Sequence, residues 1–218
     1  MSLAIFDLDN TLIKGDSDHS WGEFLVQKGI VDTQAFKQAN DLFYQQYNDG
    51  QLDINEYLRF TLQPLTQFSM QQLAELQEEF MREVIEPIIL PDAEALLQKH
   101  RDQGDYLLII SATNEFVVGP IAKRFKVDHA IACQVEIIDG RYTGKPIGIP
   151  SFQAGKITRL ESWLEDHPQH SMQDAWFYSD SRNDLPLLEQ VARPIAVDAD
   201  ETLTARAKQA GWPIISLR

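Results

Sequence analysis

Ala4-Ile5-Phe6-Asp7-Leu8-Asp9-Asn10-Thr11-Leu12 joins a short apolar run to two carboxylates that are one residue apart. Residues 3–8 predict a buried β-strand, and alternation along a strand places Asp7 and Asp9 on the same side. Two carboxylates this close repel each other, and burial strengthens the repulsion. Three arrangements relieve it: the pair shares a proton, a cation lies between the two groups, or the strand has ended and both groups face solvent.

The composition is that of an ordinary globular protein, and it limits the partners. Of the 218 residues, 44% are hydrophobic and 24% are charged. No apolar run approaches the ~20 residues needed to cross a bilayer. The net charge of −14 disfavours nucleic acid and anionic membranes as partners. Cys133 is the single cysteine, so no internal disulfide can form and a reducing cytoplasm is expected.

Helical patterns fill the segment between the first strand and the next one. Periodic apolar residues predict helices from about residue 17 to residue 86. Start and stop signals separate these helices: Gly29 and Gly50 as stops, and Asp32 or Thr33, Asp53 and Ser69 as N-caps. We therefore expect a helical cap domain at 16–86 and a core domain formed by 1–15 and 87–218.

Strands and helices alternate in the rest of the chain. Strands are predicted at 106–110, 175–179, 194–197 and 213–216, a hairpin at 133–145 around Asp139-Gly140, and helices at about 92–102, 115–125, 155–165, 185–191 and 202–210. This alternation predicts an α/β fold, in which a mostly parallel, Rossmann-like sheet has helices on both faces.

Polar residues of complementary chemistry follow the predicted strands, where the active sites of parallel sheets lie. The set comprises Asp7, Asp9, Ser111, Lys156, Asp180 and Asp184. Carboxylates at positions 7, 9 and 180 suit Mg²⁺, which prefers oxygen ligands. Ser111 and Lys156 suit phosphate oxygens, and we expect the N–H groups after Ser111 to lie at a helix N-terminus, where anions bind.

This set, in this order, resembles the four motifs of the haloacid dehalogenase-like (HAD) hydrolases. Residues 7–11 resemble motif one, Ser111 motif two, Lys156 motif three, and Asp180 with Asp184 motif four. The resemblance covers nearly the whole chain and implies the HAD fold. It is nearest to the phosphoserine-phosphatase-like branch, subfamily IB, in which a helical C1-type cap is inserted after the first strand.

The resemblance implies a Mg²⁺-dependent phosphomonoester hydrolase. Asp7 would attack phosphorus and form an aspartyl-phosphate, and Asp9 would protonate the leaving alcohol and then activate water. The implied metal residues are Asp7, Asp9 through its main-chain carbonyl, Asp180 and Asp184, the last orienting metal-bound water or Lys156. The implied phosphate-binding residues are Ser111, Ala112 and Lys156, and Asn183 would help to hold the surrounding loop.

Two positions depart from the family pattern and leave the substrate open. Ser181 stands where motif four commonly has glycine, and Ala112 stands where phosphoserine phosphatases usually have glycine. In that branch an acidic residue after motif one binds the substrate amine, and a cap arginine binds its carboxylate. Asp16, with Asp18 as an alternative, and Arg59 lie at about these positions. We expect a small amino-phosphate such as phosphoserine or histidinol phosphate, bound by a monomer or homodimer.

Other functions remain open or are disfavoured. Phosphotransfer to an acceptor other than water uses the same residues, so it stays an alternative to hydrolysis. A phosphate-binding or regulatory protein without turnover is expected to have lost Asp9 or Lys156, and both are present. Dehalogenation is disfavoured, because it requires neither Asp9 nor the metal-binding acids, and the sequence contains both. A receiver-type signalling domain is shorter and lacks the helical insertion.

Overall fold

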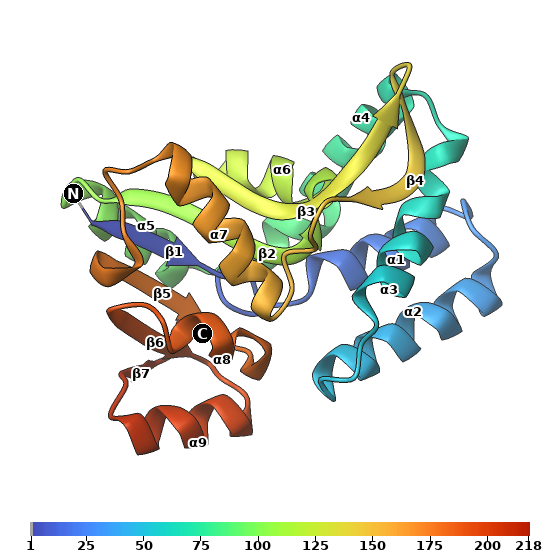
Figure 1. Ribbon diagram of the computed structural model, residues 1–218. Coiled ribbons are helices and arrows are strands. Elements are labelled where there is room, and N and C mark those ends of the chain that lie inside the picture. The colour runs from blue at the N-terminus through green and yellow to red at the C-terminus, as the bar shows by residue number, and fades with distance from the viewer. Residues whose placement is uncertain (1) are drawn as a thin grey trace.

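The computed structural model describes residues 2–218, apart from the side chain of Thr33 (Figure 1). Within these residues, seven strands form one sheet in the order β4-β3-β2-β1-β5-β6-β7. The strands are β1 Leu3–Phe6, β2 Tyr106–Asn114, β3 His129–Ile138, β4 Arg141–Ile147, β5 Ala175–Ser179, β6 Arg193–Val197 and β7 Ile214–Ile215. Neighbouring strands are parallel except β3 and β4, which form the predicted antiparallel hairpin. The predicted α/β fold with a mostly parallel sheet is confirmed.

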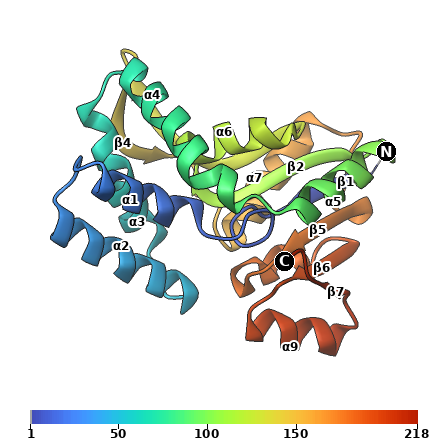
Figure 2. The same ribbon diagram turned by 180° about the vertical axis from the view of Figure 1, so that it is seen from behind.

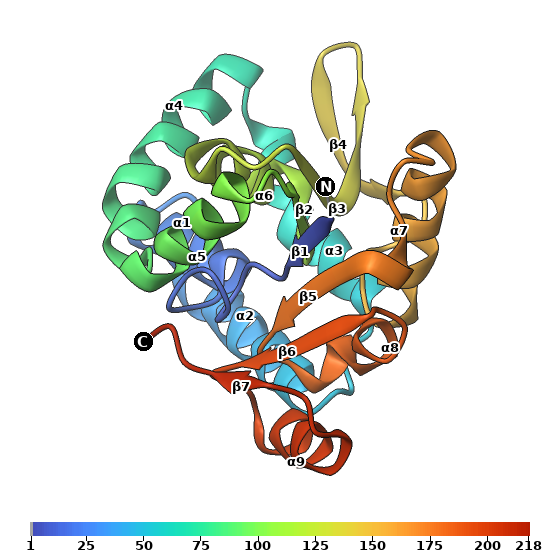
Figure 3. The same ribbon diagram turned by 90° about the vertical axis from the view of Figure 1, so that its left-hand side faces the viewer.

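Helices cover both faces of the sheet because strand β1 at its centre is apolar throughout. Leu3 and Ile5 pack into one hydrophobic cluster, and Ala4 and Phe6 pack into the other. The helices are α5 Pro91–Asp102 and α6 Glu115–Phe125 on one face, and α7 Ala154–Asp166, α8 Leu185–Leu188 and α9 Glu201–Ala210 on the other. Figure 3 shows α5 and α6 on the opposite side of the strands from α7 and α8.

The helices inserted after β1 are α1 Ser17–Gln27, α2 Thr33–Asn48, α3 Ile54–Leu62 and α4 Met70–Phe80, followed by a π-helical turn at Met81–Ile85. Of these, α2, α3 and α4 begin where side-chain caps were predicted. Short 3₁₀ helices lie at Gln63–Gln67, Glu86–Ile88, Met172–Asp174 and Arg182–Asp184. Asp16, Asp32, Asp53 and Ser69 each accept a backbone N–H in the first helical turn, which satisfies an otherwise unpaired donor.

Aromatic side chains join the inserted helices to the sheet. Trp21 of α1 contacts Phe80 of α4 and Phe116 of α6 edge-on, with ring centroids 5.1 Å and 5.2 Å apart. All three lie in the cluster that covers the α5 and α6 face of the sheet. Figure 2 shows α1 and α4 on that side of the molecule. Helices α1 and α4 are therefore anchored to the sheet, and this anchor fixes the position of the turn that leads into α1.

Several element boundaries differ from the prediction. Strand β1 ends at Phe6 instead of residue 8, β2 continues to Asn114 instead of ending at residue 110, and α8 ends at Leu188. The β2 extension crosses a shift in its register with β3, between Ile110 and Asn114, so the added residues lie in a bulge. No helix in the described residues is long and apolar enough to cross a membrane.

Candidate active site

Strand β1 ends at Phe6, so the two opening carboxylates lie on the turn that follows it, and strand alternation does not set their directions. The Asp7 N–H still donates to the Tyr178 carbonyl at 2.9 Å, and the chain then leaves the sheet. The Leu8 carbonyl accepts the Leu12 N–H at 2.9 Å, and Asn10 has a φ of 57°. This turn directs Asp7 and Asp9 to different partners, although both line the same pocket.

Lys156 lies beneath Asp7 because α7 begins at a close backbone contact. A Cβ on Gly155 would lie 2.1 Å from the Pro150 carbonyl oxygen, so only glycine fits there. The Lys156 ammonium lies 2.8 Å from Asp7 Oδ1 and 2.7 Å from Asp184 Oδ1, and its side chain is 2% exposed. Burial alone would lower the pKa of Lys156, but attraction to Asp184 and Asp7 raises it, so the ammonium stays charged.

Thr11 links Asp7 to Asp180 of the loop after β5. Its hydroxyl oxygen lies 3.4 Å from Asp7 Oδ2 and 3.3 Å from Asp180 Oδ1, and it accepts the Asp180 N–H at 3.1 Å. Asp184 accepts a hydrogen bond from the Ser179 hydroxyl at 2.7 Å. Burial, followed by repulsion from Asp7 and Asp184, raises the pKa of Asp180 well above its usual range. Asp180 forms no ion pair within the described part of the chain.

The charge balance of this group fits a divalent cation. When ionised together, Asp7, Asp180 and Asp184 would carry three negative charges against the single positive charge of Lys156, and a divalent cation would offset the excess of two. Nowhere in residues 2–218 do three or more His, Cys, Asp or Glu side chains form a cluster with metal-binding geometry. Of the four implied metal residues, Asp7 and Asp180 would bind through their carboxylates and Asp9 through its carbonyl, whereas both carboxylate oxygens of Asp184 contact Lys156.

The Asp9 carboxylate is oriented by three donors. Asp9 Oδ1 accepts the Ser17 N–H at 2.6 Å, and Asp9 Oδ2 lies 2.9 Å from the Thr113 hydroxyl and 3.4 Å from the Ser111 hydroxyl. Burial and repulsion from Asp16 raise the pKa of Asp9 to about 6, although the hydrogen bonds from Ser17 and Thr113 oppose this.

Ser111 does not follow the end of its strand, which corrects the predicted position. It lies in the bulge of β2, and its hydroxyl accepts the Thr113 N–H at 3.1 Å. Helix α6 begins only at Glu115, with Asn114 as its N-cap. The N–H groups directly after Ser111 therefore do not belong to a helix N-terminus. The bulge nevertheless places Ser111, Ala112 and Thr113 on the pocket wall.

The pocket lies between these loops and the inserted helices α1, α2 and α3. Its lining residues are Asp7, Asp9, Asp16, Asp18, Phe43, Tyr44, Tyr47, Leu52, Ile54, Tyr57, Ser111, Ala112 and Thr113. Four of them are carboxylic acids and three are tyrosines, and no lysine or arginine occurs among the described residues that line it. The lining of the pocket around Asp7 and Asp9 is therefore acidic and aromatic.

Two predicted residues lie away from the pocket. Arg59 is exposed on α3 and lines a different surface hollow with Phe60 and Phe36. The Asn183 amide donates to the Tyr47 carbonyl at 3.2 Å and accepts a hydrogen bond from Gln153 at 3.2 Å, so it joins α2 to the start of α7. The geometry brings together Asp7, Asp9, Asp16, Ser111, Ala112, Lys156, Asp180 and Asp184, but not Arg59.

Sequence reasoning missed the role of several site residues. Thr11 and Thr113 orient carboxylates. Thr11 lies within motif one and Thr113 directly follows Ala112, so their positions in the sequence were an available signal. Tyr44, Tyr47 and Tyr57 were assigned to the helical insertion with no site role. Nothing in their local sequence distinguishes them from core aromatics, because their position depends on how α2 and α3 dock.

Comparison with known proteins agrees with the residues at the site. A model of the haloacid dehalogenase-like hydrolase family matches residues 4–189 of the chain. Because this match covers most of the chain and the motif residues converge in the structure, the chain belongs to the HAD hydrolases, as its motifs indicate.

Individual relatives cover the full chain. A histidinol-phosphatase of Neisseria meningitidis serogroup C (strain 8013) is 47% identical over 220 residues, with 100% of this chain and 99% of the relative covered. A phosphoserine phosphatase of Mycobacterium tuberculosis (strain ATCC 25618 / H37Rv), SerB1, is 30% identical, with 99% of this chain and 70% of that protein covered.

Solved structures share the fold. A protein of unknown function from Bordetella pertussis Tohama I has a TM-score of 0.92 at 41% identity, covering 100% of this chain and 99% of that one. A substrate-bound phosphoserine phosphatase has a TM-score of 0.73 at 17% identity, covering 100% and 93%. At 17% identity, the similarity to this phosphoserine phosphatase shows a shared fold and nothing more.

Proposed function

We propose that the chain is a phosphatase: a Mg²⁺-dependent phosphomonoester hydrolase whose substrate is histidinol phosphate. The observation that carries the proposal is a buried Asp7–Lys156 pair whose Asp7 lines a pocket with acidic and aromatic walls. Histidinol phosphate carries an amine and an imidazole but no carboxylate. Phosphoserine carries a carboxylate, which would meet Asp16 and Asp18 without a lining cation to offset the repulsion. The relative that is 47% identical is a histidinol-phosphatase.

Asp7 is the nucleophile in this proposal. A carboxylate oxygen of Asp7 attacks phosphorus, the bond from phosphorus to the substrate oxygen breaks, and Asp9 gives its proton to the departing alkoxide. Water then attacks the phosphorus of the aspartyl-phosphate, Asp9 takes a proton from that water, and the bond to Asp7 breaks. Lys156, 2.8 Å from Asp7, offsets charge on Asp7 and on the phosphoryl oxygens.

A cation at this site suits the uncompensated charge of the acidic group. Asp7, Asp180 and the main-chain carbonyl of Asp9 would hold it. Bound there, Mg²⁺ offsets the negative charge of the phosphoryl group and of Asp7. Asp184 has both carboxylate oxygens within 2.8 Å of the Lys156 ammonium, so its role in the proposal is to orient that lysine.

Turnover of p-nitrophenyl phosphate and histidinol phosphate, with Mg²⁺ and with EDTA, tests the proposal. We expect Mg²⁺-dependent release of equal amounts of alcohol and inorganic phosphate, and a kcat lower by several orders of magnitude in Asp7→Asn. The exposed Asp49→Asn is the matched control and should retain activity. Full activity in EDTA or in Asp7→Asn would contradict the mechanism. Faster hydrolysis of phosphoserine than of histidinol phosphate would contradict the substrate.

A further inference from the structure

Asp18 is a buried carboxylate with one oxygen that the protein leaves unsatisfied. It lies in the first turn of α1, is 2% exposed and lines the pocket. Asp18 Oδ1 accepts hydrogen bonds from the Thr61 hydroxyl and the Asn114 amide, each at 3.1 Å. Asp18 Oδ2 is also buried and has no hydrogen-bond partner within residues 2–218. Burial raises the pKa of Asp18 to about 7, while Thr61 opposes the shift.

Burying a carboxylate oxygen without a hydrogen-bond donor costs folding free energy. Such an oxygen at the wall of a pocket therefore suggests a ligand that donates to it. None of the described residues that line the pocket is a cation, so the charge of Asp18 is offset by neutral hydrogen-bond donors alone. A molecule in the pocket can supply the missing donor, in addition to the Tyr57 hydroxyl, whose hydrogen bonding lowers the pKa of Asp18. An N–H group that carries positive charge would provide both the hydrogen bond and the opposite charge.

The surroundings of Asp18 favour a planar nitrogen heterocycle over a simple ammonium group. Ile54, Tyr57 and Thr61 are spaced three and four residues apart on α3, so they share one helix face, and Thr61 of that face bonds Asp18. Ile54 and Tyr57 line the pocket with Phe43, whose ring centroid is 5.4 Å from that of Tyr57. Aromatic and aliphatic walls beside a carboxylate suit a flat cation with an apolar face.

Asp16 and Asp18 are positioned differently within the pocket. Asp16 is the N-cap of α1, and its Oδ1 accepts the His19 N–H at 2.8 Å. Asp18 lies in the first turn of α1, lines the pocket and accepts a hydrogen bond from Thr61 of α3. Two carboxylates with different surroundings match a ligand that carries two different nitrogen groups.

We infer that Asp18 Oδ2 accepts a hydrogen bond from a ring N–H of the substrate, and that Asp18 with Tyr57 selects phosphomonoesters that carry a protonated nitrogen heterocycle. The inference rests on the proposed function and assigns the imidazole of histidinol phosphate to this part of the pocket. Asp18 is then a specificity-determining residue that is separate from the phosphoryl-transfer residues.

The test compares histidinol phosphate with phenylalaninol phosphate, which has the same amine and a ring without an N–H. Asp18→Asn keeps an acceptor for Thr61 and Asn114 but places an amide N–H₂ where the substrate N–H would bond. We expect the ratio of kcat/KM for histidinol phosphate to that for phenylalaninol phosphate to fall roughly 30-fold, the effect of one hydrogen bond to a charged group. Asp49→Asn, the same change at an exposed position, should leave the ratio unchanged.

Calorimetric binding of histidinol and phenylalaninol, neither of which has a phosphate, separates recognition from catalysis. We expect wild type to bind histidinol more tightly, and Asp18→Asn to lose that preference. An unchanged preference in Asp18→Asn, or none in wild type, would overturn the inference even if turnover is as proposed. A third outcome separates the two claims. If the protein has no phosphatase activity but Asp18→Asn loses the preference for histidinol, the recognition role of Asp18 is supported and the proposed function is refuted.

Discussion

Lys156 is the residue on which the buried charges of the site depend. It is the only cation that contacts Asp7 and Asp184 in the described residues. Removing one partner of a buried ion pair leaves an unpaired charge in a poorly solvated place. We therefore predict that Lys156→Met lowers the free energy of unfolding in EDTA by about 3–5 kcal/mol, measured by urea denaturation.

A double variant controls for the loss of packing by Lys156. Asp184→Asn in the Lys156→Met background removes one of the two stranded carboxylates, so it should recover part of the lost stability. If Lys156→Met costs under ~1 kcal/mol, or if Asp184→Asn adds further destabilisation in that background, the buried charges are compensated in some other way.

Asp18 makes the free energy of unfolding depend on pH, and its raised pKa means that stability falls as pH rises. The pKa rises from 3.8 to about 7 on folding because burial disfavours the charged form. The folded chain then binds this proton more tightly than the unfolded chain, so stability falls as pH rises from about 4 to about 7. We predict that the advantage of Asp18→Asn over wild type in free energy of unfolding grows by roughly 2–3 kcal/mol between pH 5 and pH 8. Urea titrations at both pH values measure it, and a constant difference would contradict the assigned shift.

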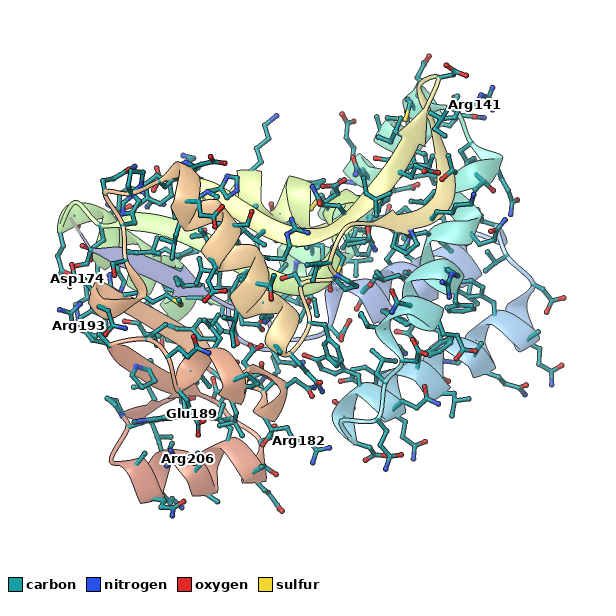
Figure 4. The ribbon with its side chains drawn as sticks, viewed as in Figure 1. Arg141, Asp174, Arg182, Glu189, Arg193 and Arg206 are labelled. Atoms are coloured by element: carbon teal, nitrogen blue, oxygen red, sulfur yellow. The ribbon has the colours of Figure 1, made fainter. Side chains whose placement is uncertain are left out.

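At the scale of elements, the loop after β5 holds the end of α2 over the pocket. Arg182 donates to the Asn48 carbonyl at 2.5 Å, and Asn183 donates to the Tyr47 carbonyl at 3.2 Å. Figure 4 shows Arg182 extending from the C-terminal part of the chain toward α2. Since α2 carries Tyr44 and Tyr47 to the pocket, the loop that holds Asp180 also helps to keep the pocket closed.

We predict that Arg182→Ala raises KM for histidinol phosphate roughly threefold to tenfold with a smaller change in kcat, because it removes one hydrogen bond from a charged donor. Arg193→Ala is the matched control. Arg193 pairs with Asp174 at 3.0 Å and is labelled far from α2 in Figure 4, so KM should not change. Equal effects of the two variants on KM would show that the contact with α2 does not close the pocket.

The elements that were predicted well are those whose signal is local. β1 and β5 are short apolar runs, and the β3–β4 hairpin turns at Asp139-Gly140, where both residues have positive φ. The end of β2 was not predictable, because Ser111 to Asn114 is polar and becomes strand only by pairing with β3 across a bulge. Likewise, Asp7 and Lys156 are 149 residues apart, so the family motifs, and not spacing, indicated their contact.

Part of the site could not be predicted from the sequence, because it also depends on contacts between distant elements. The lining by Tyr44, Tyr47 and Tyr57 depends on how α2 and α3 dock on the rest of the chain. Arg59 lies on the same helix as Tyr57, but two positions on, so it points elsewhere. A helix pattern in the sequence identifies which residues share a face but not which face meets the pocket.

At the scale of the whole molecule, the net charge of −14 opposes the approach of a phosphate. Salt screens such repulsion, so we predict that kcat/KM for p-nitrophenyl phosphate rises roughly twofold to fivefold between 10 and 200 mM NaCl at fixed Mg²⁺. Histidinol phosphate carries positive nitrogen groups as well, and its kcat/KM should change less. A fall in kcat/KM for p-nitrophenyl phosphate with salt would mean that local positive charge outweighs the global field.

The covalent role of Asp7 is the claim on which the proposed function rests. An Asp9→Asn variant mixed with p-nitrophenyl phosphate isolates it, because this leaving group needs no proton and the second step lacks its base. The mixture is quenched in acid, reduced with borohydride, digested and analysed by mass spectrometry. We predict reduction of Asp7 to homoserine, which marks an aspartyl-phosphate at that position. Release of one equivalent of p-nitrophenol without modification of Asp7, or with modification of another residue, would contradict the mechanism.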